Sequence, residues 1–344
     1  MTTTAPTFMP TPDDESGRRH NLRCAALSDP AVRQELYHRH PVVCNSLMVI
    51  TDPVRQVYEA IAQSVVHRTP GSPFIGDFRM GKTRTIGAVR RQLQKTFPNV
   101  PVALLIAKQH DNPSERAFFG DVLNDFRHSA ALSGSAAERR LRLLTIITSA
   151  AMSMGSDRYV IFIDEGQNWD LQEYVWLRDL TNDLVERGVV CIVIVFGHSE
   201  LNALRDRVIS SGRTDLLGRF FLTPRPFRGL SNVAELRKTL EAFDRRERHE
   251  FPEGSGVCMA EFFMPVAFED GWRMAAEADD LWAAFQRVAS RRGRTAGNIG
   301  MQWVMSTIRS MLFSGMDADA PGFKFGVETL VQCVESSEYE SSLQ

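Results

Sequence analysis

Short apolar runs alternate with amphipathic stretches through the middle of the chain, and this pattern predicts a layered α/β core. The apolar runs are typical of buried strands and lie at residues 74–75, 100–107, 159–163 and 189–196. The stretches between them have helical periodicity and lie at residues 83–97, 114–129, 136–152 and 171–187. Continuous apolar strands separated by helices favour a parallel sheet with helices on both faces.

The sequence on either side of this core predicts helices alone. Asp29-Pro30 and Asp52-Pro53 each place an acid and a proline where a helix begins. After Pro224 the apolar residues recur at helical spacing, at 233–248, 274–289 and 297–312. We therefore expect a flexible N-terminal tail, a helical segment, the α/β core, a small all-α C-terminal lid domain and a C-terminal tail. Their predicted bounds are 1–28, 29–72, 73–228, 229–334 and 335–344.

The strongest chemical motif lies between the first predicted strand and the helix after it. Residues Gly76-Asp77-Phe78-Arg79-Met80-Gly81-Lys82-Thr83 match the phosphate-binding pattern GxxxxGK[ST]. Backbone N–H groups of such a loop face phosphate oxygens. We expect these residues and Arg84 to bind ATP, with Lys82 neutralising the phosphates and Thr83 holding Mg²⁺ through its hydroxyl. Arg79 stands where many such loops have glycine.

Polar residues follow two further predicted strands. Asp164 and Glu165 end the run 159–163, and a buried acid pair is costly unless a metal or hydrogen bonds satisfy it. We expect Asp164 to bind Mg²⁺ and Glu165 to deprotonate the attacking water. The run 189–196 ends in Gly197-His198-Ser199-Glu200, where His198 is the first choice for sensing the γ-phosphate. Ser199 is the second choice, and it also suits a helix N-cap.

Four arginines follow the strand predicted at residues 189–196, and one of them is a candidate for action in a neighbouring subunit. Charge that develops on a transferred phosphoryl group needs a cation, which a second subunit can supply. Arg219, in Leu217-Gly218-Arg219-Phe220, is the preferred candidate. The alternative is a set of solvated arginines. The other three are Arg205, Arg207 and Arg213.

Composition and charge narrow the class of protein. The formal net charge of −2 gives no overall basic field, so contact with DNA requires a local patch. The five cysteines are scattered without a CxxC pair, which argues against a disulfide framework and a cysteine zinc site. The longest apolar run, 189–196, is too short to cross a bilayer, and the N-terminal residues do not have the pattern of a signal peptide. We expect a cytoplasmic location and no membrane partner.

Taken in order, these motifs resemble those of the AAA+ ATPases that regulate DNA transposition, namely the TnsC and TniB family and, more distantly, MuB. The resemblance rests on residues 76–83, on the strand end 161–167 with its Asp-Glu-x-Gln turn, on 197–200 and on Arg219-Phe220. It implies a P-loop AAA+ core with a helical lid, and Mg²⁺ and ATP bound at subunit interfaces. It also implies a ring or helical filament on double-stranded DNA that links a target-selection protein of the TniQ or TnsD type to the transposase and disassembles on hydrolysis.

Two other functions stay open beside this one. The chain is also compatible with an AAA+ ATPase switch or loader in another DNA process, such as phage defence or replication. A nucleotide-gated protein scaffold without a DNA role is the third possibility, although such a scaffold has no need of Glu165. In the lid, Gly297-Asn298-Ile299-Gly300 has glycine where AAA+ relatives often carry an arginine, so the sensor is either lost or replaced. The replacement candidates are Arg291, Arg292 and Arg294.

A ring or filament contacts DNA phosphates through loops that face its bore. The loop after the second strand, 108–116, is the first candidate, and a basic cluster around residues 139–142 is the second. Phosphate contact needs no base recognition and depends strongly on salt. The alternative is that these side chains are solvated or pair with Glu138 on one helix face. The predicted DNA-binding residues are Lys108, Ser114, Arg116, Arg139 and Arg140.

Overall fold

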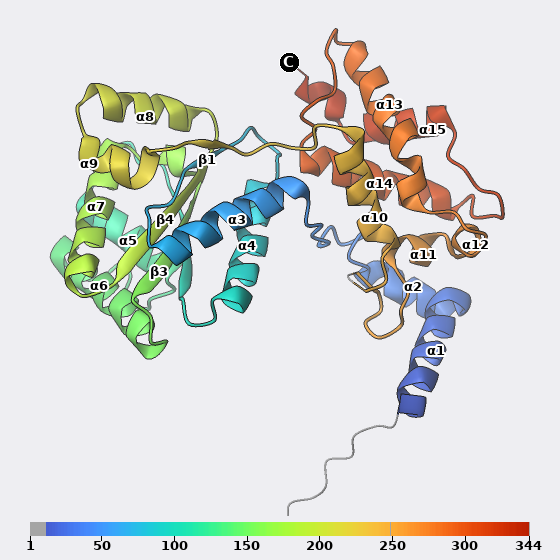
Figure 1. Cartoon of the computed structure of the whole chain (residues 1–344), viewed down its shortest axis with the longest axis horizontal. Helices are drawn as coiled ribbons and strands as arrows, with labels where there is room; N and C mark the ends of the chain where they lie inside the picture. Colours follow the sequence, from blue (N-terminus) through green and yellow to red (C-terminus); the bar gives the residue numbers. More distant parts are fainter. Residues whose placement is uncertain (1–11, 248, 344) are drawn as a thin grey trace, which may run out of the picture. The chain divides into compact units, whose positions relative to one another are not determined.

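The computed structural model describes residues 12–247 and 249–343, which form two compact units (Figure 1). One unit is continuous in sequence, from residue 52 to 229. The other combines the N-terminal residues up to 51 with the residues from 230 onward. The residues predicted to bind nucleotide, metal and DNA all lie in the continuous unit, so the fold of that unit decides how they meet. The lid-sensor candidates Arg291, Arg292 and Arg294 lie in the other unit.

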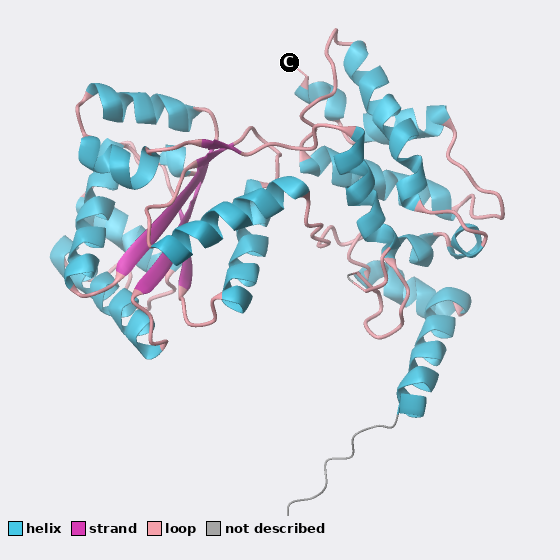
Figure 2. Ribbon diagram, viewed as in Figure 1, coloured by secondary structure: helices cyan, strands magenta, loops and turns pink. Residues whose placement is uncertain are grey.

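The continuous unit contains one five-stranded parallel sheet (Figure 2). The apolar runs predict four of these strands and their parallel arrangement, but not the two-residue strand at Arg225–Pro226. Its strands, in the spatial order β2-β3-β4-β1-β5, are paired in parallel throughout. The carboxyl ends of β3, β4 and β1 therefore lie at one edge of the sheet, where Ile75 is opposite Gly197. The strand bounds are β1 Phe74–Ile75, β2 Val102–Ile106, β3 Arg158–Asp164, β4 Val190–Gly197 and β5 Arg225–Pro226.

Helices cover both faces of this sheet. Alternate residues of a strand point to opposite faces, and in β3 the residues on both faces are buried. Ile161 and Ile163 belong to a core shared with α5, α6 and α7, whereas α3 and α4 pack together and contact β4 and β3 respectively. At the edge strand β2, the Ile106 N–H donates to the Asp125 carboxylate at 2.8 Å. The helix bounds are α3 Asp52–His67, α4 Lys82–Thr96, α5 Glu115–Asp125, α6 Ala136–Ser153, α7 Leu171–Glu186, α8 Glu200–Ser210 and α9 Thr214–Leu216.

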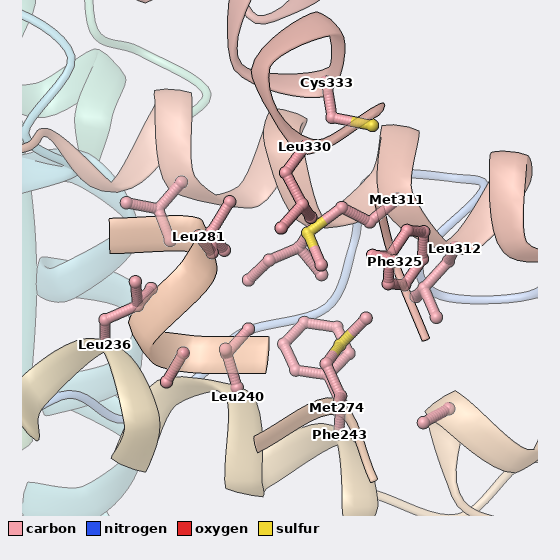
Figure 3. Packing of buried hydrophobic residues seen from close by; sticks show 14 of the residues in the cluster. Leu236, Leu240, Phe243, Met274, Leu281, Met311, Leu312, Phe325, Leu330 and Cys333 are labelled. Atoms are coloured by element: carbon pink, nitrogen blue, oxygen red, sulfur yellow. The ribbon is translucent and has the colours of Figure 1, made fainter. Parts of the chain in front are cut away.

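The second unit is helical around one apolar core, as predicted for the C-terminal domain. Figure 3 shows part of this core, to which α10 contributes Leu236, Leu240 and Phe243, α14 contributes Met311 and α15 contributes Leu330. No helix in the described part of the chain is long and apolar enough to span a bilayer. The helix bounds are α1 Pro12–Ser28, α2 Pro30–Arg39, α10 Val233–Asp244, α11 Met259–Phe263, α12 Pro265–Glu269, α13 Ala278–Ser290, α14 Met301–Met316 and α15 Val327–Ser336.

Both predicted tails need correction within the described residues. The expected tail 1–28 is a helix, α1, from Pro12 onward, and residues 1–11 lie outside the described residues. Arg23 of α1 pairs with the buried Glu261, which Arg246 also contacts at 3.0 Å, so an ion pair holds α1 to this unit. The expected tail 335–344 includes the last two residues of α15 and then Tyr339, which is buried. The predicted helical segment 29–72 is also divided, because α3 belongs to the unit with the sheet.

Candidate active site

The loop between β1 and α4 has the backbone of a phosphate-binding loop. Gly76 donates its N–H to the Gly197 carbonyl at 3.0 Å, and a Cβ at Gly76 would lie 2.3 Å from the Phe227 carbonyl oxygen. Only glycine therefore fits at this position. Gly81, directly before α4, has a φ of 96°, and Arg79 has a φ of 62°. A left-handed conformation costs a non-glycine residue about 1–2 kcal/mol, so the loop holds Arg79 in a strained conformation.

Lys82, the first residue of α4, places its charge inside this loop. Its side chain is 7% exposed, and its Nζ donates to the carbonyls of Gly76 at 2.7 Å and Asp77 at 2.9 Å. Burial lowers the pKa of Lys82, while the negative charges of Glu165 and Asp164 act in the opposite direction. The ammonium is thus in position to neutralise phosphate oxygens that approach the loop.

Thr83 and Asp164 meet although 81 residues separate them in sequence. The Thr83 hydroxyl donates to Asp164 Oδ2 at 2.6 Å. Asp164 is buried, and burial raises the pKa of its carboxyl. The hydrogen bond from Thr83 acts in the opposite direction and lowers this pKa. A hydroxyl and a carboxylate are oxygen ligands of the kind that Mg²⁺ prefers, so these two residues fit that ion. No group of three or more His, Cys, Asp or Glu side chains suited to a metal occurs among the described residues.

Glu165 follows Asp164 in a left-handed conformation, with a φ of 54°. Its Oε2 accepts a hydrogen bond from Gln167 Nε2 at 2.7 Å. Gln167 Oε1 in turn accepts the backbone N–H of His198 at 3.3 Å. Sequence reasoning did not include Gln167 among the site residues, although the Asp-Glu-x-Gln turn contains it.

His198 lies at the end of β4, beside the phosphate-binding loop. Its ring centroid is 4.9 Å from that of Phe78, and its side chain is 13% exposed. Phe78 itself is 69% exposed. Ser199 precedes α8, but its side chain makes no capping hydrogen bond, so the capping role considered for it is wrong.

Arg219 lies in a five-residue π-helical segment, Leu217–Phe221, that follows α9. Its guanidinium donates to the hydroxyl of Thr181 at 3.0 Å and to the side-chain oxygen of Asn182, both on α7. The trans role of Arg219 stays a prediction. The other three arginines also have partners in their own unit: Arg205 with the Phe221 carbonyl, Arg207 with Asp170 and Arg213 with Asp215.

The loop between β2 and α5, where DNA contact is predicted, is held by its own unit. Lys108 pairs with Asp121 at 2.8 Å. The His110 ring lies between two acids, with Nε2 3.1 Å from Asp121 Oδ2 and Nδ1 3.2 Å from Glu173 Oε1. Ser114 caps α5 by accepting a backbone N–H at 3.2 Å. The loop therefore has a defined conformation, and DNA contact by Lys108 and Ser114 stays a prediction.

The predicted contact of Arg139 with DNA is wrong because this side chain is structural. Arg139 is 4% exposed and donates to the carbonyls of Arg116 at 2.7 Å and Ser133 at 3.3 Å. Arg140, with 27% of its side chain exposed, pairs with Asp183 of α7 at 2.7 Å. Arg116 is exposed, and the described residues supply no acidic partner for it. Of the basic residues predicted to bind DNA, Arg116 is thus the most available.

Residues 73–204 match the family model described as AAA domain. No curated protein sequence matches the chain. Among solved structures, the Aeropyrum pernix ORC2 protein in its ADP form is similar with a TM-score of 0.52 and 9% identity, over 84% of this chain and 69% of that chain.

Two further structures are similar with lower scores. The Drosophila ORC bound to DNA has a TM-score of 0.45 and 12% identity, over 97% of this chain and 69% of that chain. Domain III of the Thermotoga maritima replication initiation protein DnaA has a TM-score of 0.44 and 12% identity, over 84% of this chain and 93% of that chain. Together with the sheet order and the loop geometry, the family match and the ORC2 likeness establish that the chain has an α/β P-loop fold of the AAA+ type, with an AAA domain at residues 73–204.

Proposed function

We propose that this protein is an AAA+ ATPase that acts as an ATP-dependent switch or loader in a DNA process. The observation that carries the proposal is the meeting of Lys82, Thr83, Asp164 and Glu165 at one edge of the sheet. The fold is similar to that of ORC2, a protein solved with ADP. That likeness supports the broader assignment, a switch or loader, better than it supports transposition.

The geometry supports in-line hydrolysis of the terminal phosphate of ATP. Lys82 neutralises the phosphate oxygens, and Thr83 and Asp164 would hold Mg²⁺, which draws electron density from those oxygens when bound. Glu165 takes a proton from water while the water oxygen bonds to the γ-phosphorus. The bond from that phosphorus to the bridging oxygen then breaks, which yields ADP and phosphate. His198, next to the loop, contacts the γ-phosphate in this proposal.

Regulation of DNA transposition is the narrower form of the proposal. The order of the motifs favours it, in particular the Asp-Glu-x-Gln turn at 164–167 and Arg219-Phe220. In this form the protein assembles with ATP as a ring or filament on double-stranded DNA. It then links a target-selection protein of the TniQ or TnsD type to the transposase and disassembles after hydrolysis. Addition of purified transposase to the assembled complex tests this form separately.

The main experiment combines ATP hydrolysis with electron microscopy. The wild-type protein and Glu165→Gln are each incubated with ATP and Mg²⁺, with and without duplex DNA. We expect wild-type hydrolysis, a loss of at least about 100-fold in Glu165→Gln, and assemblies that persist in this variant only with both ATP and DNA. Hydrolysis at the wild-type rate in Glu165→Gln would exclude Glu165 as the base. Assemblies that form equally well without DNA would favour the scaffold instead.

A further inference from the structure

The turn that carries Glu165 has a backbone that its surroundings fix. Asn168 donates its N–H to the Glu165 carbonyl at 2.9 Å, and the Tyr174 hydroxyl donates to the Gly166 carbonyl at 2.8 Å. A Cβ at Gly166 would lie 2.3 Å from the side chain of Val195. This turn therefore has one conformation available. The turn fixes the position at which the Glu165 side chain begins. It does not fix the side-chain torsion angles, which determine where the carboxylate lies.

One side chain restricts those torsions. Gln167 Nε2 donates to Glu165 Oε2 at 2.7 Å, and Gln167 Oε1 accepts the N–H of His198 at 3.3 Å. The two partners also determine the orientation of the amide, because a carboxylate only accepts and a backbone N–H only donates. The Gln167 amide thus bridges the end of β3, which carries the acid, to the end of β4, which carries His198.

Gly197 lies opposite the Gln167 amide, and its lack of a side chain leaves room for that amide. A Cβ at Gly197, the last residue of β4, would lie 2.6 Å from Gln167 Oε1. The backbone of Gly197 does not have a positive φ, so alanine is allowed there by conformation. The atom that a new methyl group would displace is the far end of a flexible side chain. The absence of a side chain at Gly197 therefore allows the Gln167 amide to occupy its observed position.

We propose that Gln167 is a positioning residue, which holds the Glu165 carboxylate at a fixed distance from the end of β4. This inference rests on the proposed ATPase function. With Oε2 bound to the amide, Oε1 is the oxygen directed to the attacking water. A base must lie within hydrogen-bond reach of the proton that it takes, and misplacement lowers the rate of the chemical step. Binding of ATP by the loop at 76–84 does not depend on this bridge.

The test separates the chemical step from nucleotide binding. Gln167→Met keeps the length of the side chain but removes its hydrogen bonds to Glu165, His198 and Asn168. Gly197→Ala displaces the amide while leaving Gln167 itself unchanged. Gln92→Met is the matched control, because Gln92 is an exposed residue of α4 whose amide, among the described residues, donates to the Thr96 hydroxyl. For each protein, kcat and KM for ATP, the affinity for a non-hydrolysable ATP analogue and the thermal unfolding midpoint are measured.

We expect Gln167→Met to lower kcat by about 10- to 100-fold while analogue affinity changes less than about threefold. Gly197→Ala should lower kcat in the same direction, by a smaller factor, and Gln92→Met should behave as the wild type. A wild-type kcat in Gln167→Met, or an equal loss of analogue affinity, would overturn the inference. One set of results overturns the role of Gln167 but keeps the proposed ATPase function. In that set the wild type and Gln167→Met hydrolyse ATP at the same rate, and Glu165→Gln does not hydrolyse it. A wild-type protein that binds ATP without hydrolysing it overturns the proposed function as well.

Discussion

The buried positive charge of Lys82 is stabilised by neighbouring groups. Its ammonium is removed from water but donates to two carbonyls of its own loop, and Asp164 and Glu165 lie close enough to favour its charged form. We predict that Lys82→Ala weakens ATP binding by at least about tenfold, because a charged hydrogen bond contributes about 1.5–3 kcal/mol. Lys95→Ala, an exposed change in the last turn of the same helix, is the control. Equal affinity of both variants for ATP would contradict the phosphate-binding role.

A second prediction at the level of single residues concerns the buried His40. Its ring is fully buried against Phe251, Phe262 and Phe263, and burial lowers its pKa to about 3. The unfolded chain takes up a proton near pH 6.5 and the folded chain does not, so this group costs stability as the pH falls below 6.5. We expect a loss of about 2 kcal/mol between pH 7 and pH 5 from this histidine alone.

The measurement compares urea unfolding of the wild type and of His40→Asn at the two pH values. The asparagine keeps an acceptor near the Val42 N–H, which His40 Nδ1 accepts at 3.2 Å, and it does not titrate. The variant should be less stable at pH 7 and should lose less stability on acidification. Identical pH dependence in the two proteins would show that His40 is not the group responsible.

Among the elements, α6 shows how one residue can support a neighbouring loop. Arg139 points from α6 to carbonyls of α5 and of the loop before α6, whereas the adjacent Arg140 makes a partly exposed ion pair. We predict that Arg139→Ala lowers the free energy of unfolding by about 1–3 kcal/mol, because buried carbonyls are left without their donor. Arg140→Ala should cost less than about 1 kcal/mol. Chemical denaturation measures both, and equal costs would contradict the structural role of Arg139.

The same elements show what the sequence could and could not predict. The four apolar runs and the phosphate-binding pattern are local signals, so β1 to β4, the helix after Gly81 and the acids at the end of β3 were predictable. The two-residue strand β5 has no such signal. The burial of Arg139 was not, because it depends on carbonyls of another helix and a loop. Likewise, the bridge proposed for Gln167 forms only when β4 brings the His198 N–H within reach. The helix α1 has a weak apolar pattern, and it is held to the second unit by the buried Ala26 and by an ion pair between Arg23 and the distant Glu261.

At the scale of the whole molecule, the proposed action depends on neighbouring subunits. Arg219→Ala lacks the proposed finger, and Glu165→Gln lacks the base but retains its finger. If Arg219 acts in trans, a mixture of the two inactive variants contains about a quarter of interfaces with both groups intact. We expect each variant alone to hydrolyse little ATP and the mixture to recover part of the activity. Without recovery, Arg219 does not act across an interface.

The proposed binding to DNA also belongs to the scale of the assembled molecule. We predict that Arg116→Ala lowers affinity for duplex DNA and reduces the slope of log affinity against log salt by about 0.9 for each DNA phosphate that the variant no longer neutralises. Fluorescence polarisation with ATP analogue at several salt concentrations measures this slope. Arg127→Ala, which changes an arginine between α5 and α6, is the control. An unchanged slope in Arg116→Ala would remove this residue from the DNA interface.

The two edge strands of the sheet, β2 and β5, affect which surfaces another copy of the chain can use. At one edge, the carboxylate of Asp125 already accepts the N–H of Ile106. At the other, β5 has two residues, and the second is a proline without an N–H group. The second edge is thus too short, within the described residues, to offer a long row of unpaired donors and acceptors to another chain. In the proposed assembly, copies of this protein would therefore meet through helices and loops, and the addition of strands from another copy, which leads to irreversible aggregation, is disfavoured at β5.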